Sequence, residues 1–345
     1  MSDFEYLPPE VSTLLSNVDA CIIWEHEHQP PRGHEVYHPS AFGNCLRLMQ
    51  YQRYEERGLV KGEKKKPSPD LCRIWGNGHS MHDRWRGYFE TMGVLRGYWQ
   101  CSNPFCGFWG DDGELISTNF NELYKKDNQW GKRRRVHGTN NLQGCFKPDR
   151  CVCGCKKFKY EEVDVVNKEL NFSGHADIIL DFSIIEQLKA KEIIKVLNLN
   201  HIPTKPIVVD MKSINHFYYQ DVAKGNPHKY YLTQLMIYIN ILQCEYGVLI
   251  YENKNNQKSC AFKVNARSED LYPHIVKTAK IMNEMTEVVD ENGEKLNLLP
   301  PPKAVFKDEE SDICKYCEYT KLCYSSPIWD DPDIDQIRKD FYGDI

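Results

Sequence analysis

The residues best suited to chemistry are two aspartates and a lysine in neighbouring apolar segments. Asp177 stands in HADIIL, and Asp210 and Lys212 stand in IVVDMKS. Residues i and i+2 of a β-strand share a face, so Asp210 and Lys212 project into one space while Met211 points toward apolar packing. Carboxylate oxygens are hard ligands for Mg²⁺ or Mn²⁺, and a lysine beside them can orient a metal-bound water. A D-x-K triplet also occurs at solvated strand edges, but the apolar run PIVV before it favours a buried edge.

Two helical segments offer further candidate residues. GHSMHDRW carries His82, and LTQLMIYINILQ carries Gln234 and Tyr238 four residues apart. Residues at this spacing lie on one face of a helix. Taken alone, such a histidine is usually structural, and such a Gln–Tyr pair usually belongs to an ordinary helix surface. Their weight comes from their order along the chain relative to the carboxylates.

Four motifs follow one another in the order G-x-x-x-H-[ED], G-x-x-D, D-x-K and Q-x-x-x-Y. They are Gly78-His-Ser-Met-His82-Asp83, Gly174-His-Ala-Asp177, Asp210-Met-Lys212 and Gln234-Leu-Met-Ile-Tyr238. This order resembles that of the PD-(D/E)XK nucleases of the RecB type, whose third motif is often E-x-K. The resemblance implies an α/β fold, with a mixed central sheet flanked by helices as a restriction-endonuclease-like core.

The resemblance also implies a role for each motif. The implied metal ligands are His82, Asp177, Asp210 and the backbone carbonyl of Met211. Lys212 would act on the nucleophilic water. Gln234 and Tyr238 would line the DNA-facing side of the site.

A second constellation joins the two ends of the chain. Cys314, Cys317 and Cys323 form C-x₂-C-x₅-C, one ligand short of the four that structural zinc and iron–sulfur clusters ordinarily take. Spacing alone favours zinc, and Cys45 by itself would be a buried apolar residue. However, an N-terminal cysteine in HPSAFGNCLRLMQYQRY together with this C-terminal set resembles the iron-staple nucleases, which include the AddB nuclease domain and the CRISPR-associated Cas-four exonucleases. The resemblance implies a 4Fe–4S cluster on Cys45, Cys314, Cys317 and Cys323, which ties the C-terminus to the core.

A third group of cysteines lies in the middle of the chain. Cys101-Ser-Asn-Pro-Phe-Cys106-Gly and Cys151-Val-Cys153-Gly-Cys155 both have a glycine directly after a cysteine, as metal-binding knuckles do. They predict a closed Zn²⁺ site from Cys101, Cys106 and two of the later trio, with Cys153 and Cys155 preferred. Which of Cys145, Cys151, Cys153 and Cys155 bind zinc stays open, and all could be small apolar filler. The basic run 132–135 (KRRR) is either a loop presented to DNA or solvated surface.

Composition limits the classes of protein. The chain has 345 residues, 14 cysteines and a net charge of −5, which argues against a generally basic nucleic-acid coat. No apolar run approaches the ~20 residues of a membrane span, and MSDFEYLPPE lacks the basic and apolar parts of a secretory signal. We therefore expect a cytoplasmic protein without membrane contact, whose cysteines serve as metal ligands rather than disulfides.

The elements that must position these residues follow from periodicity. We expect helices from Ser40 to Gly58, from Pro69 to Glu90 and from Ser268 to Val288, and a hairpin of YGVLIYEN with KSCAFKVN. The expected units are an N-terminal helical part with the first cluster cysteine (1–98), a cysteine-rich zinc insertion (99–157), the nuclease core (158–265) and a C-terminal part with the iron–sulfur cysteines and an acidic tail (266–345).

The function that these features predict is a Mg²⁺- or Mn²⁺-dependent deoxyribonuclease. The resemblance favours an exonuclease on single-stranded or frayed DNA ends over an endonuclease, with recombination or replication proteins as candidate partners. Two alternatives stay open. One is a non-catalytic iron–sulfur and zinc DNA-binding protein with a vestigial nuclease centre, and the other is a redox sensor that uses the cluster.

Overall fold

The computed structural model describes most of the chain. The described residues are 9–29, 33–64, 66–103, 106, 108–109, 114–115, 136–138, 141–185, 195, 197–198, 200–266, 271–288, 292–293, 298–304 and 314–343. The basic run 132–135 lies outside them.

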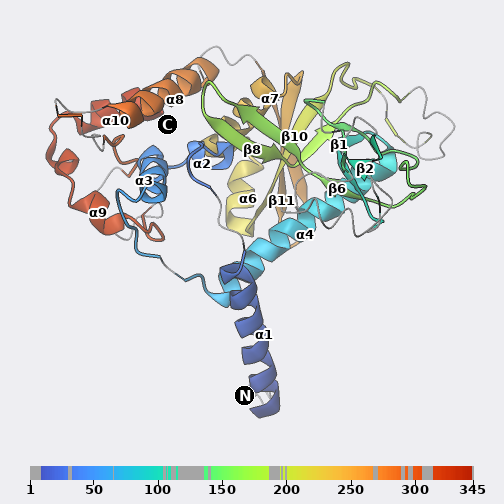
Figure 1. Ribbon diagram of the computed structural model, residues 1–345, viewed down its shortest axis with the longest axis horizontal. Helices are drawn as coiled ribbons and strands as arrows, with labels where there is room; N and C mark the ends of the chain where they lie inside the picture. The colour runs from blue at the N-terminus through green and yellow to red at the C-terminus, as the bar shows by residue number, and fades with distance from the viewer. Residues whose placement is uncertain are drawn as a thin grey trace.

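A mixed sheet forms the centre of the protein (Figure 1). Among the described residues it has eight strands, in the order β12 (Ser259–Asn265), β11 (Tyr246–Asn253), β10 (Ile207–Ile214), β9 (Ile178–Leu180), β1 (Leu95–Cys101) and β4 (Val136–His137), with β5 (Cys145–Phe146) and β6 (Phe158–Glu161) also paired to β1. Only β10 and β11 run parallel within this described sheet. Two short hairpins flank it, β2 (Phe108–Trp109) with β3 (Glu114–Leu115) and β7 (Val163–Asn167) with β8 (Phe172–Ala176).

Helices cover the sheet and extend beyond it. They are α1 (Pro9–Glu27), α2 (Pro39–Phe42), α3 (Leu46–Glu56), α4 (Pro69–Met92), α6 (His216–Val222), α7 (Lys229–Ile241), α8 (Leu271–Glu287), α9 (Thr320–Tyr324), the 3₁₀ helix η2 (Pro327–Asp330) and α10 (Ile334–Tyr342). The predicted mixed α/β architecture, with a mixed sheet flanked by helices, is therefore confirmed. No helix of the described residues is long and apolar enough to cross a membrane.

The two faces of the sheet carry separate halves of the core. On one face Leu235 and Ile239 of α7 pack with Val208 and Leu249. On the other face Met81 of α4 packs in a cluster that contains Val209, Met211 and Ile178. The alternation along β10 thus sends its even-numbered residues toward α7. Gly247 of β11 permits the close approach of α7, because a Cβ there would lie 2.7 Å from Cγ of Leu235.

Local signals set the ends of α4. Ser68 is its N-cap and accepts a hydrogen bond from the Leu71 N–H at 3.2 Å, and Pro69 occupies the first turn. Gly93 ends the helix in the left-handed region at φ +79°. The predicted start at Pro69 is confirmed, and the helix continues two residues past the predicted Glu90.

The predicted single helix from Ser40 to Gly58 is wrong, because the segment forms two helices. α2 ends at Phe42 and α3 begins at Leu46, with Cys45 as an extended N-cap at φ −86°, ψ 110°. The break coincides with a tight contact: a Cβ at Gly43 would lie 2.5 Å from the carbonyl oxygen of Tyr230. The interruption puts Cys45, which is partly buried, at the start of a helix rather than inside one.

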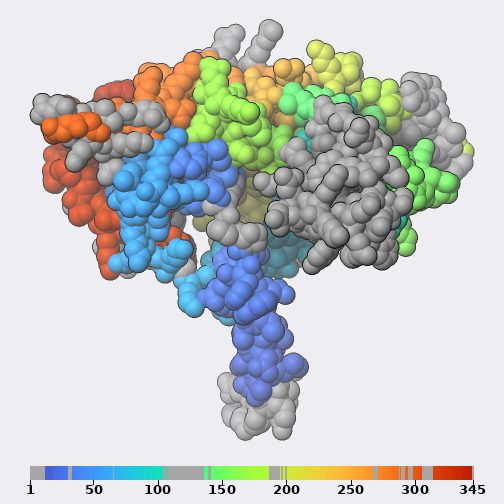
Figure 2. Space-filling model, in the orientation of Figure 1, coloured from blue at the N-terminus to red at the C-terminus, as the bar shows by residue number. Residues whose placement is uncertain are grey.

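Helix α1 extends away from the rest of the protein (Figure 2). It packs along α4, where Arg73 pairs with Asp19, and Glu27 in its last turn pairs with Lys66 at 2.6 Å. In contrast, α3 and α10 meet around a shared core that includes Leu46, Met282 and Tyr342.

Candidate functional site

The predicted carboxylate–lysine pair lies on the face of β10 that α7 covers. Asp210 is 0% exposed, and its Oδ1 accepts a hydrogen bond from Lys212 Nζ at 2.9 Å. Lys212 Nζ also donates to Oε1 of Gln234 at 3.1 Å. Gln234 Nε2 in turn donates to the hydroxyl of Tyr238 at 3.1 Å. The structure therefore brings these four predicted residues into one chain of hydrogen bonds.

Asp177 and His82 reach the same place from two other elements. Asp177 occupies the bend between β8 and β9, and its Oδ2 lies 3.5 Å from Nδ1 of His82. The other ring nitrogen, Nε2, lies 3.0 Å from the carbonyl oxygen of Met211. Met211 itself is buried on the α4 side of the sheet, as its alternation with Asp210 predicted.

The charges in this site influence one another strongly. Burial raises the pKa of Asp210 to about 7, with Lys212 opposing the shift and the charge of Asp177 adding to it. Burial also acts to raise the pKa of Asp177, but its hydrogen bond and ion pair with His82 outweigh burial and lower this pKa. For His82, burial acts to lower the pKa, and the Asp177 carboxylate raises it overall. The raised pKa of His82 and the lowered pKa of Asp177 favour an ion pair between them, beside an Asp210 carboxyl that exchanges its proton near neutral pH.

One atom of the site is unsatisfied. Oδ2 of Asp210 is buried and has no hydrogen-bond partner among the described residues. A buried carboxylate oxygen without a partner is costly, so a proton or a cation beside it would be stabilising. The atoms that could hold a cation there are the Asp177 and Asp210 carboxylates, a ring nitrogen of His82 and the Met211 carbonyl.

Two residues that the sequence analysis missed fix the bend at Asp177. Arg86 Nε donates to the Asp177 carbonyl at 3.2 Å, and the hydroxyl of Tyr160 donates to the same oxygen at 3.1 Å. Arg86 also pairs with Glu162. Arg86 lies four residues after His82 on α4, so helical spacing could have identified it. Tyr160 comes from β6, and no local signal connects it with the site.

The four cysteines at the chain ends line one small cavity of about 20 Å³. Cys45 is the N-cap of α3, Cys314 and Cys317 lie in the turns before α9, and Cys323 lies within α9. Burial raises the pKa of Cys323 to about 11, with Arg47 opposing the shift and the other three cysteines adding to it. The structure thus brings together the four residues that the resemblance implied.

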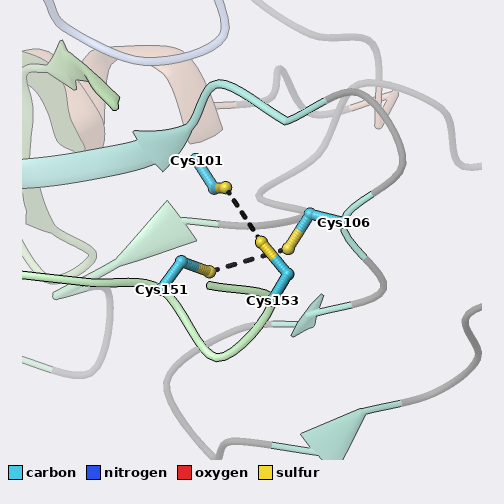
Figure 3. Close-up of side chains that lie close together, drawn as sticks. All are labelled: Cys101, Cys106, Cys151 and Cys153. Atoms are coloured by element: carbon cyan, nitrogen blue, oxygen red, sulfur yellow. Dashed lines mark hydrogen bonds between the residues drawn. The ribbon is translucent and has the colours of Figure 1, made fainter. Parts of the chain in front are cut away.

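The middle cysteines form a tighter cluster (Figure 3). The sulfurs of Cys101, Cys106, Cys151 and Cys153 all lie within 4.8 Å of one another, and the pairs 101–153 and 106–151 are each 3.6 Å apart. Four sulfurs at about 2.3 Å from one tetrahedral zinc would lie about 3.8 Å apart. This cluster could therefore hold a metal ion.

The structure gathers Cys151, rather than the preferred Cys155, with Cys101, Cys106 and Cys153. A tight turn joins Cys151 to Cys155, in which Gly154 at φ +86° donates to the Cys151 carbonyl at 2.8 Å. This turn directs Cys151 and Cys153 into the cluster. Cys155 packs against it, but its sulfur accepts a hydrogen bond from the Lys157 N–H at 3.4 Å. Cys145 lies in β5, outside the cluster.

The fold and these sites define a mixed α/β protein with a buried carboxylate–lysine centre and a four-cysteine cluster that could bind metal. No protein-family model matches the chain, and no curated protein matches it. Among solved structures, the chain is similar to one described as "Crystal structure of SSO0001", with 14% identity over 90% of this chain and 96% of that chain. The TM-score is 0.35, too low to support a statement on fold or function.

Proposed function

We propose that the protein is a metal-dependent DNA nuclease with a restriction-endonuclease-like core of the RecB type. The observation that carries this proposal is the convergence of His82, Asp177, Asp210 and Lys212 from three separate elements. These residues come from the first three sequence motifs, and nothing in local structure requires the three elements to meet.

The donor atoms fit Mg²⁺ or Mn²⁺. His82, Asp177, Asp210 and the Met211 carbonyl would hold the ion, and the unpartnered Oδ2 of Asp210 supports its presence. When bound, such an ion lowers the pKa of a water and neutralises charge on the phosphate. While no metal is bound, a protonated His82 would balance the charge of the Asp177 carboxylate.

Lys212 is suited to hold the nucleophilic water. Its ammonium is fixed by Asp210 on β10 and by Gln234 on α7, so it has one preferred position. The hydroxyl of the buried Tyr238 in turn accepts a hydrogen bond from Gln234 and so fixes the Gln234 side chain. An ammonium with three donors can keep a further hydrogen bond for water beside the scissile phosphate.

The cysteine groups would be structural. Cys45, Cys314, Cys317 and Cys323 are proposed to hold a 4Fe–4S cluster, because they share a cavity but are not gathered as tightly as the other four. Cysteines around a cluster of several irons lie farther apart than those around one ion. Cys101, Cys106, Cys151 and Cys153 are proposed to hold zinc.

The proposal is tested with end-labelled single-stranded and duplex DNA in the presence of Mn²⁺. Asp210→Asn and Lys212→Ala should each slow cleavage by about 100-fold or more. Asp340→Asn and Lys280→Ala, which change residues of α10 and α8, serve as matched controls and should cleave at the wild-type rate. Wild-type cleavage in EDTA, or by Asp210→Asn, would contradict the proposal.

A further inference from the structure

A cleft of about 930 Å³ lies beside the proposed active site. Its lining includes Ser213 and Ile214, which follow Lys212 on β10, and two of the cysteines at the chain ends, Cys45 and Cys317. Tyr231 also lines it, and the Tyr231 ring centroid lies 4.5 Å from Nζ of Lys212. The cleft therefore borders both a direct neighbour of Lys212 and the group of cysteines at the chain ends.

The charge of this cleft differs from that of the whole chain. The described residues that line it include three lysines and no aspartate or glutamate, although the chain carries a net charge of −5. These lysines are Lys229, Lys254 and Lys303. Lys229 and Lys254 are exposed at the surface of the cleft. Such a lining favours a ligand with repeated negative charge.

Aromatic rings line the same cleft. Tyr218 and Tyr316 are 54% and 69% exposed. His228, also in the lining, stacks on Tyr230 with ring centroids 5.6 Å apart and on Tyr231 at 5.8 Å. Two exposed rings in one cleft offer flat faces on which unpaired bases can stack.

We propose that this cleft binds single-stranded nucleic acid, with unpaired bases on Tyr218 and Tyr316 and phosphates on Lys229 and Lys254. Stacked aromatic rings combined with lysines suit a single strand, because only unpaired bases offer their faces to a protein. A duplex has its bases stacked internally and would use the lysines alone. The inference rests on the proposed function, since it supplies the path by which a strand reaches Lys212.

The test measures binding without cleavage. A labelled oligothymidine of about 16 nucleotides and a hairpin duplex are titrated with protein in EDTA, and fluorescence anisotropy gives each Kd. Tyr218→Ala and Tyr316→Ala should each weaken single-strand binding by about 5-fold to 150-fold and leave duplex binding unchanged. Tyr88→Ala is the matched control, because Tyr88 on α4 is 53% exposed and lies outside the cleft lining.

The lysines are tested through salt dependence. Lys229→Gln and Lys254→Gln should each flatten the dependence of log Kd on log salt by about 0.7 for the single strand. Lys258→Gln changes an exposed lysine of the same turn as Lys254, outside the cleft lining, and should leave the slope unchanged.

The outcomes separate this inference from the nuclease proposal. Unchanged single-strand Kd in both tyrosine variants, or equal loss on duplex and single strand, overturns the assignment of the cleft. Loss confined to the single strand supports it, even if the wild-type chain never cleaves DNA with Mn²⁺. If cleavage depends on metal but both tyrosine variants bind the single strand as tightly as the wild type, the nuclease proposal stands and the assignment of the cleft is wrong.

Discussion

The two carboxylate oxygens of Asp210 have different surroundings, and this difference decides whether the site favours a proton or a cation. Its Oδ1 accepts a hydrogen bond from Lys212, whereas its Oδ2 is buried with no partner among the described residues. Burial raises the pKa of this carboxyl to about 7. The group is therefore poised between binding a proton and binding a cation at Oδ2, and pH decides which of them wins.

The first prediction is that Mn²⁺ binding weakens as the pH falls through about 7. The metal requires Asp210 as a carboxylate and His82 as a neutral imidazole, and both pKa values are raised above their ordinary ones. Thermal unfolding with and without Mn²⁺ should give a larger stabilisation at about pH 8 than at about pH 6.

Without metal, the contribution of Asp210 to folding stability depends on pH in the opposite direction. A carboxyl whose folded pKa is raised from 3.8 to about 7 contributes stability below the unfolded value, and loses it as the pH rises through the folded one. Asp210→Asn should remove the contribution of this carboxyl to the pH dependence of stability, both with Mn²⁺ and without metal. A stabilisation by Mn²⁺ that is the same at both pH values would contradict the metal assignment of Asp210.

At the scale of elements, the sequence was informative where structure is local. The period of two along a strand correctly put Asp210 and Lys212 on one face and Met211 on the other. The start of α4 at Pro69 was predicted for the same reason. The break at Gly43 was not predicted, because it coincides with a contact to Tyr230, which is far away in the sequence.

The middle cysteines illustrate the same limit. Spacing identified two clusters of candidates but could not choose among Cys151, Cys153 and Cys155, because all three lie within one turn. The turn geometry at Gly154 makes the choice, and it depends on φ at a single residue. The cleft was also missed, since its residues come from six separate stretches of the chain.

The second prediction separates the cysteines that form the cluster from the one that does not. Cys101→Ser should lose one zinc per chain, because three thiolates and a hydroxyl bind zinc far less tightly than four thiolates. Cys155→Ser is the matched control and should retain the zinc, since its sulfur faces the Lys157 backbone. Metal analysis of the purified proteins gives both results.

The two failures of this prediction mean different things. Zinc retained in Cys101→Ser would show that the four sulfurs do not form the metal site. Zinc lost in Cys155→Ser would instead return the ligand set to Cys153 and Cys155, which sequence spacing had favoured.

For the molecule as a whole, the two ends of the chain depend on each other. The hydroxyl of Tyr342 accepts a hydrogen bond from the Leu46 N–H at 3.2 Å and donates to the Pro301 carbonyl at 2.9 Å. Met49 of α3, Met282 of α8 and Tyr342 of α10 share one apolar cluster. Cys45 lies at this junction, so a group that ties it to Cys314 would join segments roughly 270 residues apart.

The third prediction follows from that tie. If Cys45, Cys314, Cys317 and Cys323 hold a 4Fe–4S cluster, Cys45→Ser should lose the iron and lower the unfolding temperature. A cross-link that closes a loop of this length restrains the unfolded chain and so raises the free energy of unfolding by up to about 5 kcal/mol. Iron content and visible absorption of anaerobically purified protein measure the cluster, and thermal unfolding measures the tie.

The matched control for this tie is Cys21→Ser. Cys21 is an exposed cysteine of α1, outside the cavity, so the variant should keep both its iron and its unfolding temperature. A colourless wild-type protein with zinc at this site would remove the iron–sulfur assignment but leave the tie intact. If Cys45→Ser unfolds at the wild-type temperature, the junction is held by the apolar cluster and Tyr342 alone, and the cysteines are not needed to hold the chain ends together.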